Sequence, residues 1–293
     1  MNGEERSGYA VELDYAKAPY RLGGMELDFS KETVVMGILN VTPDSFSDGG
    51  RYSQTDAALR RATEMLKDGA KIIDIGGEST RPGHTPVSLD EELERTIPII
   101  EVLAKELDCV ISIDTYKASV AEAAMKAGAH IINDVWGAKR EPRIADVAKQ
   151  FGAPIILMHN REQPIYEGNF EDEFLADIEE SIAIARNAGI AERNIWLDPG
   201  IGFAKDLNEN IAAMQSLDRL SALGYPLLLG TSRKSLIGKV LDLPVEERME
   251  GTGATVCYGV EHGCHIVRVH DVKAIARMVR MMDVLTSKQK LTI

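Results

Sequence analysis

The chain has 293 residues, of which 44% are hydrophobic and 27% are charged, the composition of an ordinary globular protein. Its formal net charge of -13 argues against a nucleic-acid-binding protein, which usually carries a basic patch. Three cysteines without a CxxC pattern support neither a disulfide framework nor a zinc site.

Short apolar runs alternate along the chain with amphipathic segments of helical length. Predicted strands cover residues 34–39, 71–75, 110–113, 130–132, 155–158, 194–197, 226–229 and 265–269. Predicted helices cover residues 55–68, 89–107, 119–127, 141–151, 171–188, 207–223, 245–262 and 273–287. Unbroken apolar runs are typical of parallel strands buried on both faces, and their alternation with helices is typical of βαβ units.

Eight such units in roughly 250 residues predict an α/β fold, a single-domain (β/α)8 TIM barrel over residues 34–287. A doubly wound open sheet is the alternative, because strand order cannot be read from a sequence. Residues 1–33 are expected to form an N-terminal extension with a short hairpin that turns at Gly23-Gly24, and residues 288–293 a tail. The extension has no apolar signal segment and no later run reaches membrane-spanning length, so we expect a cytoplasmic protein without a membrane partner.

The first predicted strand runs into a long polar loop. In MGILNVTPDSFSDGG, residues 36–50, the apolar strand gives way at Asn40 to a segment rich in turn-forming residues. A surface turn needs only about two to five residues. Two carboxylates, Asp44 and Asp48, and the aromatic Phe46 lie in this loop. Such a length and content indicate more than a simple connection.

Polar side chains follow all eight predicted strands, at the end where a TIM barrel carries its active site. Asp114, Asn133 and Asp198 end the third, fourth and sixth strands. These short side chains can hydrogen-bond a flat heterocycle that offers several donors and acceptors. The alternative for each of them is a strand-end cap or a buried polar network.

A basic group follows the second, seventh and eighth strands and consists of Arg81, Lys234, Arg268 and His270. The segment GTSRKS, residues 230–235, has the small residues and helix start that let backbone amides approach an anion. Together with VRVHD it favours an anion site over a solvated basic turn. His159 has no second histidine or cysteine at ligand spacing, so we expect a histidine at the edge of the core and not a metal ligand.

Eight motifs occur in the order typical of one enzyme family. They are ILNVTPDSFSDGG, DIGGESTRPG, SIDTYKA, INDVWG, LMH, LDPGIGFAK, GTSRKS and VRVHDV, and they extend from Ile38 to Val272. In this set the chain resembles the bacterial dihydropteroate synthases, whose fold is a TIM barrel.

The resemblance implies that 6-hydroxymethyl-7,8-dihydropterin diphosphate reacts with p-aminobenzoate to give 7,8-dihydropteroate and diphosphate. This is a step of folate biosynthesis that sulfonamides inhibit. By motif, the implied pterin-binding residues are Asp114, Asn133, Met158, Asp198, Phe203 and Lys234. The implied diphosphate-binding residues are Asn40, Thr80, Arg81, Arg268 and His270, and Asn40 also resembles the ligand of a Mg²⁺ cofactor. The implied p-aminobenzoate pocket contains Phe46, Arg81, Pro82 and Ser235.

The resemblance also implies a dissociative reaction. Diphosphate becomes a good leaving group once Mg²⁺ and two arginines neutralise its charge, and a cation-like pterin methylene remains. A loop carboxylate, Asp48 or Asp44, is expected to stabilise that carbon, while the aryl amine needs positioning more than deprotonation. The implied catalytic residues are Asp48, Arg81, Lys234, Arg268 and His270, with Arg268 contacting only the phosphates. The first loop and the GESTRPG loop are expected to close over the diphosphate.

Two other classes of protein share part of this pattern. A pterin-binding methyltransferase domain of a corrinoid-dependent enzyme would use the Asp/Asn pocket but not the Arg268/His270 pair. A non-catalytic paralogue that regulates a partner should show damaged loops, and none is visible. Members of the family are typically homodimers, and the methionine-rich segment ARMVRMMDVL near the C-terminus either forms that interface or packs on the barrel.

Overall fold

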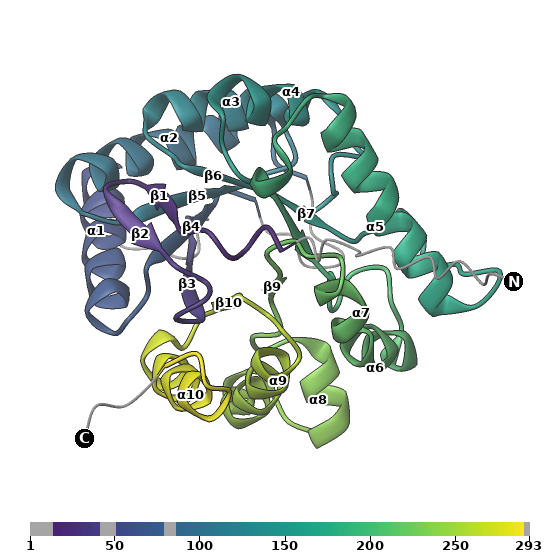
Figure 1. Cartoon of the computed structure of the whole chain (residues 1–293). Helices are drawn as coiled ribbons and strands as arrows, with labels where there is room; N and C mark the ends of the chain where they lie inside the picture. The colour runs from purple at the N-terminus through teal and green to yellow at the C-terminus, as the bar shows by residue number, and fades with distance from the viewer. Residues whose placement is uncertain (1–13, 42–50, 79–85, 290–293) are drawn as a thin grey trace, which may run out of the picture.

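Eight parallel strands form a nearly closed barrel surrounded by helices (Figure 1). The computed structural model describes residues 14–41, 51–78 and 86–289, without the side chains of residues 51–53. The strand order is β8-β7-β6-β5-β4-β3-β10-β9, and a parallel bridge between Leu197 and Leu227 brings β8 against the segment that leads into β9. This order confirms the predicted TIM barrel and excludes the doubly wound open sheet.

The barrel strands lie close to their predicted positions. They are β3 (Val34–Asn40), β4 (Ile72–Gly76), β5 (Val110–Asp114), β6 (Ile131–Asp134), β7 (Ile155–Met158), β8 (Ile195–Asp198), β9 (Leu228–Leu229) and β10 (Ile266–Val269). The helices are α1 (Arg51–Lys67), α2 (Leu89–Glu106), α3 (Ala118–Ala127), α4 (Arg143–Phe151), α5 (Phe170–Asn187), α6 (Leu207–Gln215), α7 (Leu217–Ser221), α8 (Ser235–Leu241), α9 (Met249–Glu261) and α10 (Val272–Leu285).

The helix predicted over residues 207–223 is two helices, α6 and α7. They meet at Ser216, whose hydroxyl donates to the Ala212 carbonyl at 2.8 Å. Ser216 has φ of -89° and ψ of 5°, which departs from regular helix geometry and separates the two helices. The helix predicted over 245–262 begins only at Met249, after a 3-10 turn over Val245–Glu247.

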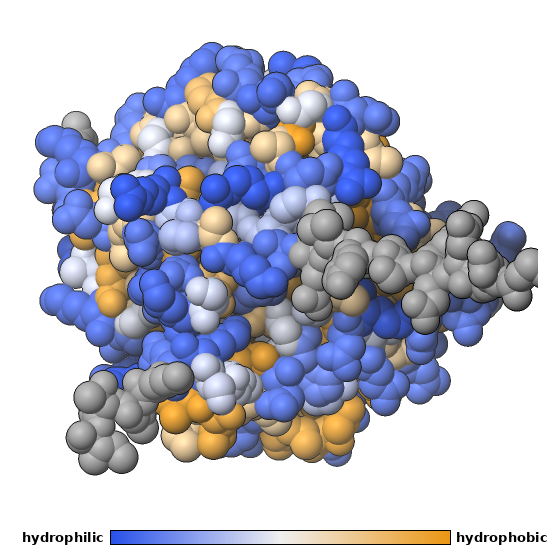
Figure 2. All heavy atoms as spheres, in the orientation of Figure 1, coloured by the Kyte–Doolittle hydropathy of each residue, from blue (hydrophilic) through white to orange (hydrophobic). Residues whose placement is uncertain are grey.

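The molecular surface in Figure 2 is largely hydrophilic, with an apolar area over the C-terminal helices. Exposed apolar side chains in this area are Val240 and Leu241 of α8, Tyr258 of α9, and Met281 and Leu285 of α10. By contrast, Met278 and Met282 of α10 pack against the core. No helix in the described part of the chain is long and apolar enough to cross a membrane.

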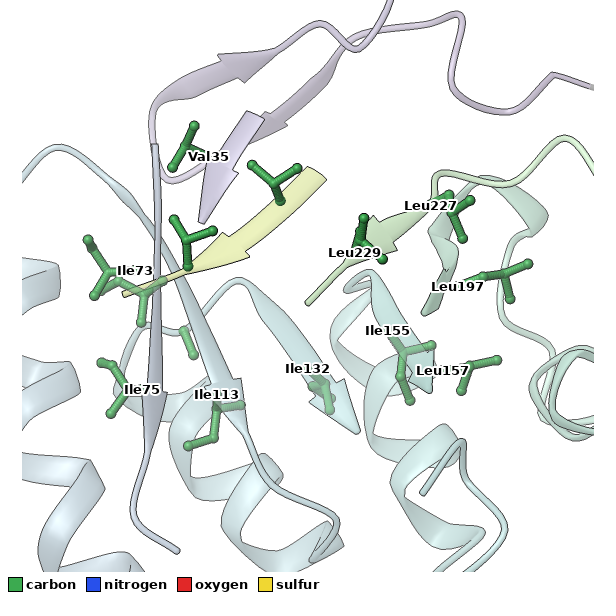
Figure 3. Close-up of a cluster of buried hydrophobic side chains, with 14 of the residues drawn as sticks. Val35, Ile73, Ile75, Ile113, Ile132, Ile155, Leu157, Leu197, Leu227 and Leu229 are labelled. Atoms are coloured by element: carbon green, nitrogen blue, oxygen red, sulfur yellow. The ribbon is translucent and has the colours of Figure 1, made fainter. Parts of the chain in front are cut away.

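The core has two layers because successive strand residues point to opposite faces. The outer layer, between strands and helices, contains the side chains drawn in Figure 3, such as Val35, Ile73 and Leu157. The inner layer fills the lower barrel with Met36, Ile72, Val110, Ile131, Ile156, Trp196, Leu228 and Ile266. The barrel is therefore solid below its mouth.

Residues 14–33 close the barrel bottom. The hairpin of β1 (Tyr20–Leu22) and β2 (Met25–Leu27) turns at Gly23 and Gly24, with φ of +55° and +75°. Positive φ at both turn residues is the geometry that glycine supplies at least cost. Tyr20, Phe29 and Trp196 form an aromatic cluster with ring centroids 5.2 to 5.5 Å apart. The segment thus belongs to the inner core.

Candidate active site at the barrel mouth

The inward positions of the strands change from apolar to polar one pleat above the solid core. In five strands, β4, β5, β6, β8 and β10, a polar residue stands two positions after the inner-layer residue. These polar residues are, in the same order, Asp74, Ser112, Asn133, Asp198 and Arg268. Since the side-chain period of a strand is two, these residues share the interior with the apolar layer beneath them. The site is therefore the upper continuation of the barrel core.

Arg268 joins two buried carboxylates at the centre of this layer. Its Nε donates to Asp74 Oδ2 and its terminal amino group to Asp114 Oδ2, each at 2.6 Å. Asn133 Nδ2 also donates to Asp74 Oδ2, at 3.1 Å. One guanidinium thus compensates two carboxylates that have almost no exposed surface.

The acceptors of this cluster are incompletely satisfied. Asp74 Oδ1, Asp114 Oδ1 and Ser112 Oγ have no hydrogen-bond partner among the described residues. Burial raises the pKa of Asp114 to about 7, against the lowering effect of Arg268. Buried unsatisfied acceptors are costly, so a ligand that brings several N–H donors would bind favourably here.

A second pair of opposite charges consists of Asp198 at the end of β8 and Lys234 directly before α8. Asp198 Oδ1 accepts from the Gly200 N–H at 2.7 Å, and Lys234 Nζ donates to the Ile201 carbonyl. Burial raises the pKa of Asp198, and burial lowers that of Lys234 to about 8, each against the effect of the other. Lys234 Nζ also lies 4.6 Å from the ring centroid of Phe203, within cation–π range.

His270 stands at the rim after β10. Its Nδ1 lies 2.9 Å from Ser232 Oγ, which accepts from the His270 N–H at 3.1 Å. A hydroxyl that accepts from the backbone can donate its own proton to Nδ1, which places the proton of the neutral ring on Nε2. Asn40 at the end of β3 and Ser235 at the start of α8 are both exposed.

The structure brings together Asp114, Asn133, Asp198, Lys234 and Arg268, with Met158 paired beside Asp198. The expected residues Asp44, Phe46, Asp48, Thr80, Arg81 and Pro82 lie outside the described residues. The guanidinium of Arg268 lies between Asp74 and Asp114 of the proposed pterin group, so it has protein partners beside the phosphates that the resemblance implies. It takes that place because β10 and β4 both flank β3, which brings Arg268 within reach of Asp74.

Sequence reasoning missed Asp74 and Ser112 because it considered only the residues that follow each strand. The available signal was the charged Asp74 inside the apolar run IIDIG, two residues after Ile72 and therefore on the same, inward face of the strand. The described residues contain no group of three or more histidine, cysteine, aspartate or glutamate side chains that could hold a metal ion.

Comparison with known proteins identifies the family. The family of pterin binding enzymes matches residues 36–270. The chain is 62% identical to dihydropteroate synthase of Bacillus subtilis over 262 residues, which cover 89% of this chain and 92% of that protein.

Solved structures agree. Clostridium difficile dihydropteroate synthase, crystallised in the presence of pteroic acid, has 49% identity and a TM-score of 0.86, with 88% of this chain and 98% of that chain covered. Yersinia pestis dihydropteroate synthase in complex with a sulfonamide drug has 41% identity and a TM-score of 0.85. The match covers 92% of this chain and 100% of that chain. The chain therefore belongs to the pterin binding enzyme family, with the dihydropteroate synthases.

Proposed function

We propose that this chain condenses 6-hydroxymethyl-7,8-dihydropterin diphosphate with p-aminobenzoate, as a dihydropteroate synthase. The observation that carries the proposal is the buried set of Asp74, Asp114, Asn133 and Asp198. Its free acceptors, Asp74 Oδ1 and Asp114 Oδ1, suit a donor-rich heterocycle. The relatives support it, since pteroic acid joins a pterin to p-aminobenzoate and was present with one of them. Sulfonamides are the expected inhibitors, in line with the Yersinia complex.

The pterin would lie above the inner core with its amino and ring N–H groups directed at Asp114, Asn133 and Asp198. Lys234 would donate to a ring carbonyl or nitrogen, and Phe203 and Met158 would contact the flat faces. Lys234 suits this role because its ammonium already lies beside the Phe203 ring.

The diphosphate would extend toward Asn40, Arg268 and His270, with Thr80 and Arg81 from the second loop. Mg²⁺ is the proposed cofactor, and the exposed amide of Asn40 fits it, because Mg²⁺ usually takes one or two protein oxygens and completes its shell with water and phosphates. When bound, the ion would neutralise phosphate charge. With Ser232 Oγ at Nδ1, His270 would direct its Nε2–H toward a phosphate oxygen.

In the reaction, the bond between the pterin methylene carbon and the diphosphate oxygen breaks. The amine nitrogen of p-aminobenzoate bonds to that carbon and loses a proton to water. Ser235 at the exposed start of α8, with Phe46, Arg81 and Pro82, would hold the second substrate. Asp48 would stabilise the positive methylene carbon, as the sequence predicts.

A homodimer is also proposed, through the apolar area on α8, α9 and α10. Membership of the family gives no oligomeric state for this chain, so the support is the exposure of five large apolar side chains on adjoining helices. A cytoplasmic location stays a prediction.

A turnover assay tests the proposed activity. Purified protein with both substrates and Mg²⁺ should release diphosphate and 7,8-dihydropteroate in equal amounts. Asp114→Asn should weaken pterin binding by about 1.5–3 kcal/mol, because it replaces a charged acceptor by a group that is half donor. Pterin binding without turnover would favour a regulatory paralogue, and methyl transfer to a corrinoid would favour the methyltransferase alternative.

A further inference from the structure

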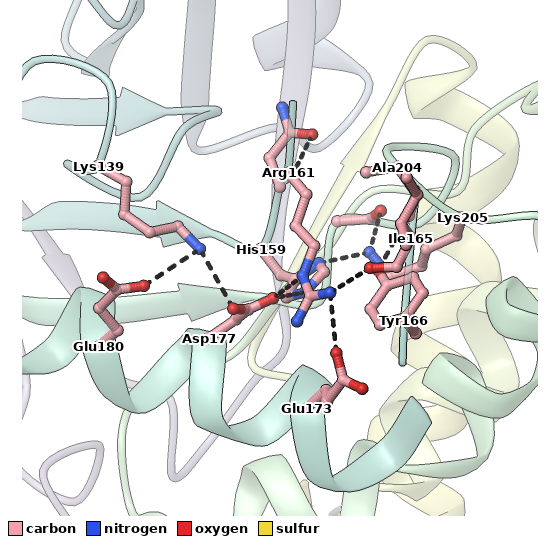
Figure 4. A network of polar contacts seen from close by, with 12 residues as sticks. Lys139, His159, Arg161, Ile165, Tyr166, Glu173, Asp177, Glu180, Ala204 and Lys205 are labelled. Atoms are coloured by element: carbon pink, nitrogen blue, oxygen red, sulfur yellow. Dashed lines mark hydrogen bonds and ion pairs between the residues drawn. The ribbon is translucent and has the colours of Figure 1, made fainter. Parts of the chain in front are cut away.

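A polar chain of three residues, here called the Lys205 relay, ends beside the proposed pterin site. It consists of Asp177 on α5, His159 after β7, and Lys205 after the turn that follows β8. His159 Nε2 lies 2.9 Å from Asp177 Oδ2, and His159 Nδ1 lies 2.7 Å from Lys205 Nζ (Figure 4). Burial lowers the pKa of Lys205 to about 7. In the ammonium form Nζ has only donors, so Nδ1 accepts from it and the ring proton on Nε2 is donated to Asp177.

The charges of the relay are defined by its surroundings. Burial alone would raise the pKa of Asp177, but hydrogen bonds from His159 and Arg161 hold it below its ordinary value. Burial lowers the pKa of His159, which has no exposed surface, to about 4. The relay thus presents an ionised carboxylate and a neutral imidazole, whose free nitrogen is a fixed acceptor for Lys205.

Lys205 uses its other two donors on the backbone of the turn after β8. Its Nζ donates to the Gly200 carbonyl at 3.0 Å and to the Phe203 carbonyl at 3.1 Å. Gly200, Gly202 and Ala204 have φ of +64°, +86° and +44°. A turn with a non-glycine residue in the left-handed region persists only where surrounding contacts hold it.

The same turn carries groups of the proposed pterin site. Its Gly200 N–H orients Asp198, and its Ile201 carbonyl accepts from Lys234. Its Phe203 ring lies beside the Lys234 ammonium. Two lysines therefore hold one turn. Lys234 lies within the proposed site, and Lys205 is held in place by His159.

We propose that Lys205 is a positioning residue for pterin recognition. Held by His159 and Asp177, its ammonium fixes the turn from Gly200 to Phe203, so that Asp198 and Phe203 are preorganised. Lys205 acts through the turn and does not contact substrate, and a preorganised site loses less conformational freedom on binding. The inference rests on the proposed pterin site.

Lys205→Met tests the proposal, because methionine keeps the length of the side chain and removes its three donors. We expect the Kd for the pterin diphosphate to rise about 10- to 100-fold, the range for lost charge-assisted hydrogen bonds. The KM for p-aminobenzoate at saturating pterin should stay within about twofold, and kcat within about threefold. In a Phe203→Ala background the effect of Lys205→Met should shrink, since both act through one turn.

Lys139→Met is the matched control, because Lys139 Nζ lies 3.9 Å from Asp177 Oδ1 but outside the relay. It should leave pterin affinity within about twofold, as expected of a long, partly exposed ion pair. Unchanged pterin affinity of folded Lys205→Met would overturn the inference, and so would an equal loss for both substrates or a loss that only follows a lowered Tm. If the methionine variant does not fold, Lys205→Gln decides, with a smaller rise in the same Kd expected. Asp114→Asn tests the pterin site separately: if that variant loses affinity and Lys205→Met does not, only the inference fails.

Discussion

At the residue scale, the ionisation of the buried carboxylates in the site depends on their ion pairs with Arg268. Asp74 and Asp114 both bond to this guanidinium, and neither accepts a hydrogen bond from a second charged side chain among the described residues. Burial and the neighbouring carboxylates raise the pKa of Asp114, whereas Arg268 lowers it. Arg268 therefore favours the ionised form of an acceptor for the pterin, in addition to its proposed contact with phosphate.

Arg268→Ala should consequently weaken binding of the uncharged pterin alcohol as well as of the diphosphate. Without its counter-charge, Asp114 would stay protonated at neutral pH and would lose about 1.5–3 kcal/mol of charge-assisted bonding. Binding of the alcohol should recover partly as the pH is raised above neutrality and the carboxyl ionises. Calorimetry with both ligands measures this. A loss confined to the diphosphate would show that Arg268 acts on phosphate alone.

The same carboxyl gives a prediction for stability against pH. Burial places the folded-state pKa of Asp114 at about 7, above the value of about 3.9 in an unfolded chain. A group with a raised pKa contributes stability that is fully present below the unfolded pKa and is lost as pH rises through the folded pKa. The free energy of unfolding of the unaltered protein, relative to Asp114→Asn, should therefore decline between about pH 4 and about pH 7.

Urea denaturation of both proteins across this range measures the difference. Burial also raises the pKa values of Asp134 and Asp198. Both residues titrate in the unaltered protein and in Asp114→Asn, so their contributions to the difference in free energy of unfolding largely cancel. A difference that does not change with pH would show that Asp114 is ionised throughout.

At the element scale, the turn after β8 depends on close contact between backbones. A Cβ on Gly200 would lie 2.0 Å from the His159 carbonyl oxygen, while a Cβ on Gly152, which also has positive φ, would meet nothing within 4 Å. Both substitutions to alanine should cost about 1–2 kcal/mol for the left-handed backbone. Gly200→Ala should cost about 1–3 kcal/mol more for overpacking, and it should also lower pterin affinity. Thermal unfolding and pterin binding of the two variants test this, and equal losses would mean that the turn can move freely away from His159.

The elements were predictable from the sequence where the signal was local. Apolar runs marked all eight strands, and strand ends marked Asp114, Asn133 and Asp198. Asp74 was missed although it interrupts an apolar run, because its role depends on a partner 194 residues away. The Lys205 relay was equally hidden, since it joins α5, β7 and the turn after β8, and only the closed barrel brings these together.

At the scale of the whole molecule, the apolar area over α8, α9 and α10 distinguishes one side of the barrel. In the segment ARMVRMMDVL, Met278 and Met282 pack on the core, as one of the two expectations has it, while Met281 is 57% exposed. The interface stays a prediction. Monomeric proteins rarely expose contiguous apolar patches of more than a few hundred Å². A twofold axis through these helices would cover the same residues in both copies, as an isologous interface requires.

Met281→Glu combined with Leu285→Glu should convert a dimer into a monomer. Two carboxylates in each copy would meet across the twofold axis in an apolar surrounding, where unpaired charges are strongly unfavourable. Ile165→Glu is the control, because Ile165 is 58% exposed but lies in the segment between β7 and α5, away from the C-terminal helices. Sedimentation equilibrium should give twice the chain mass for the unaltered protein and for Ile165→Glu, and the chain mass for the double variant. A dimer that survives both glutamates would place the interface elsewhere, and the apolar area would then require another explanation.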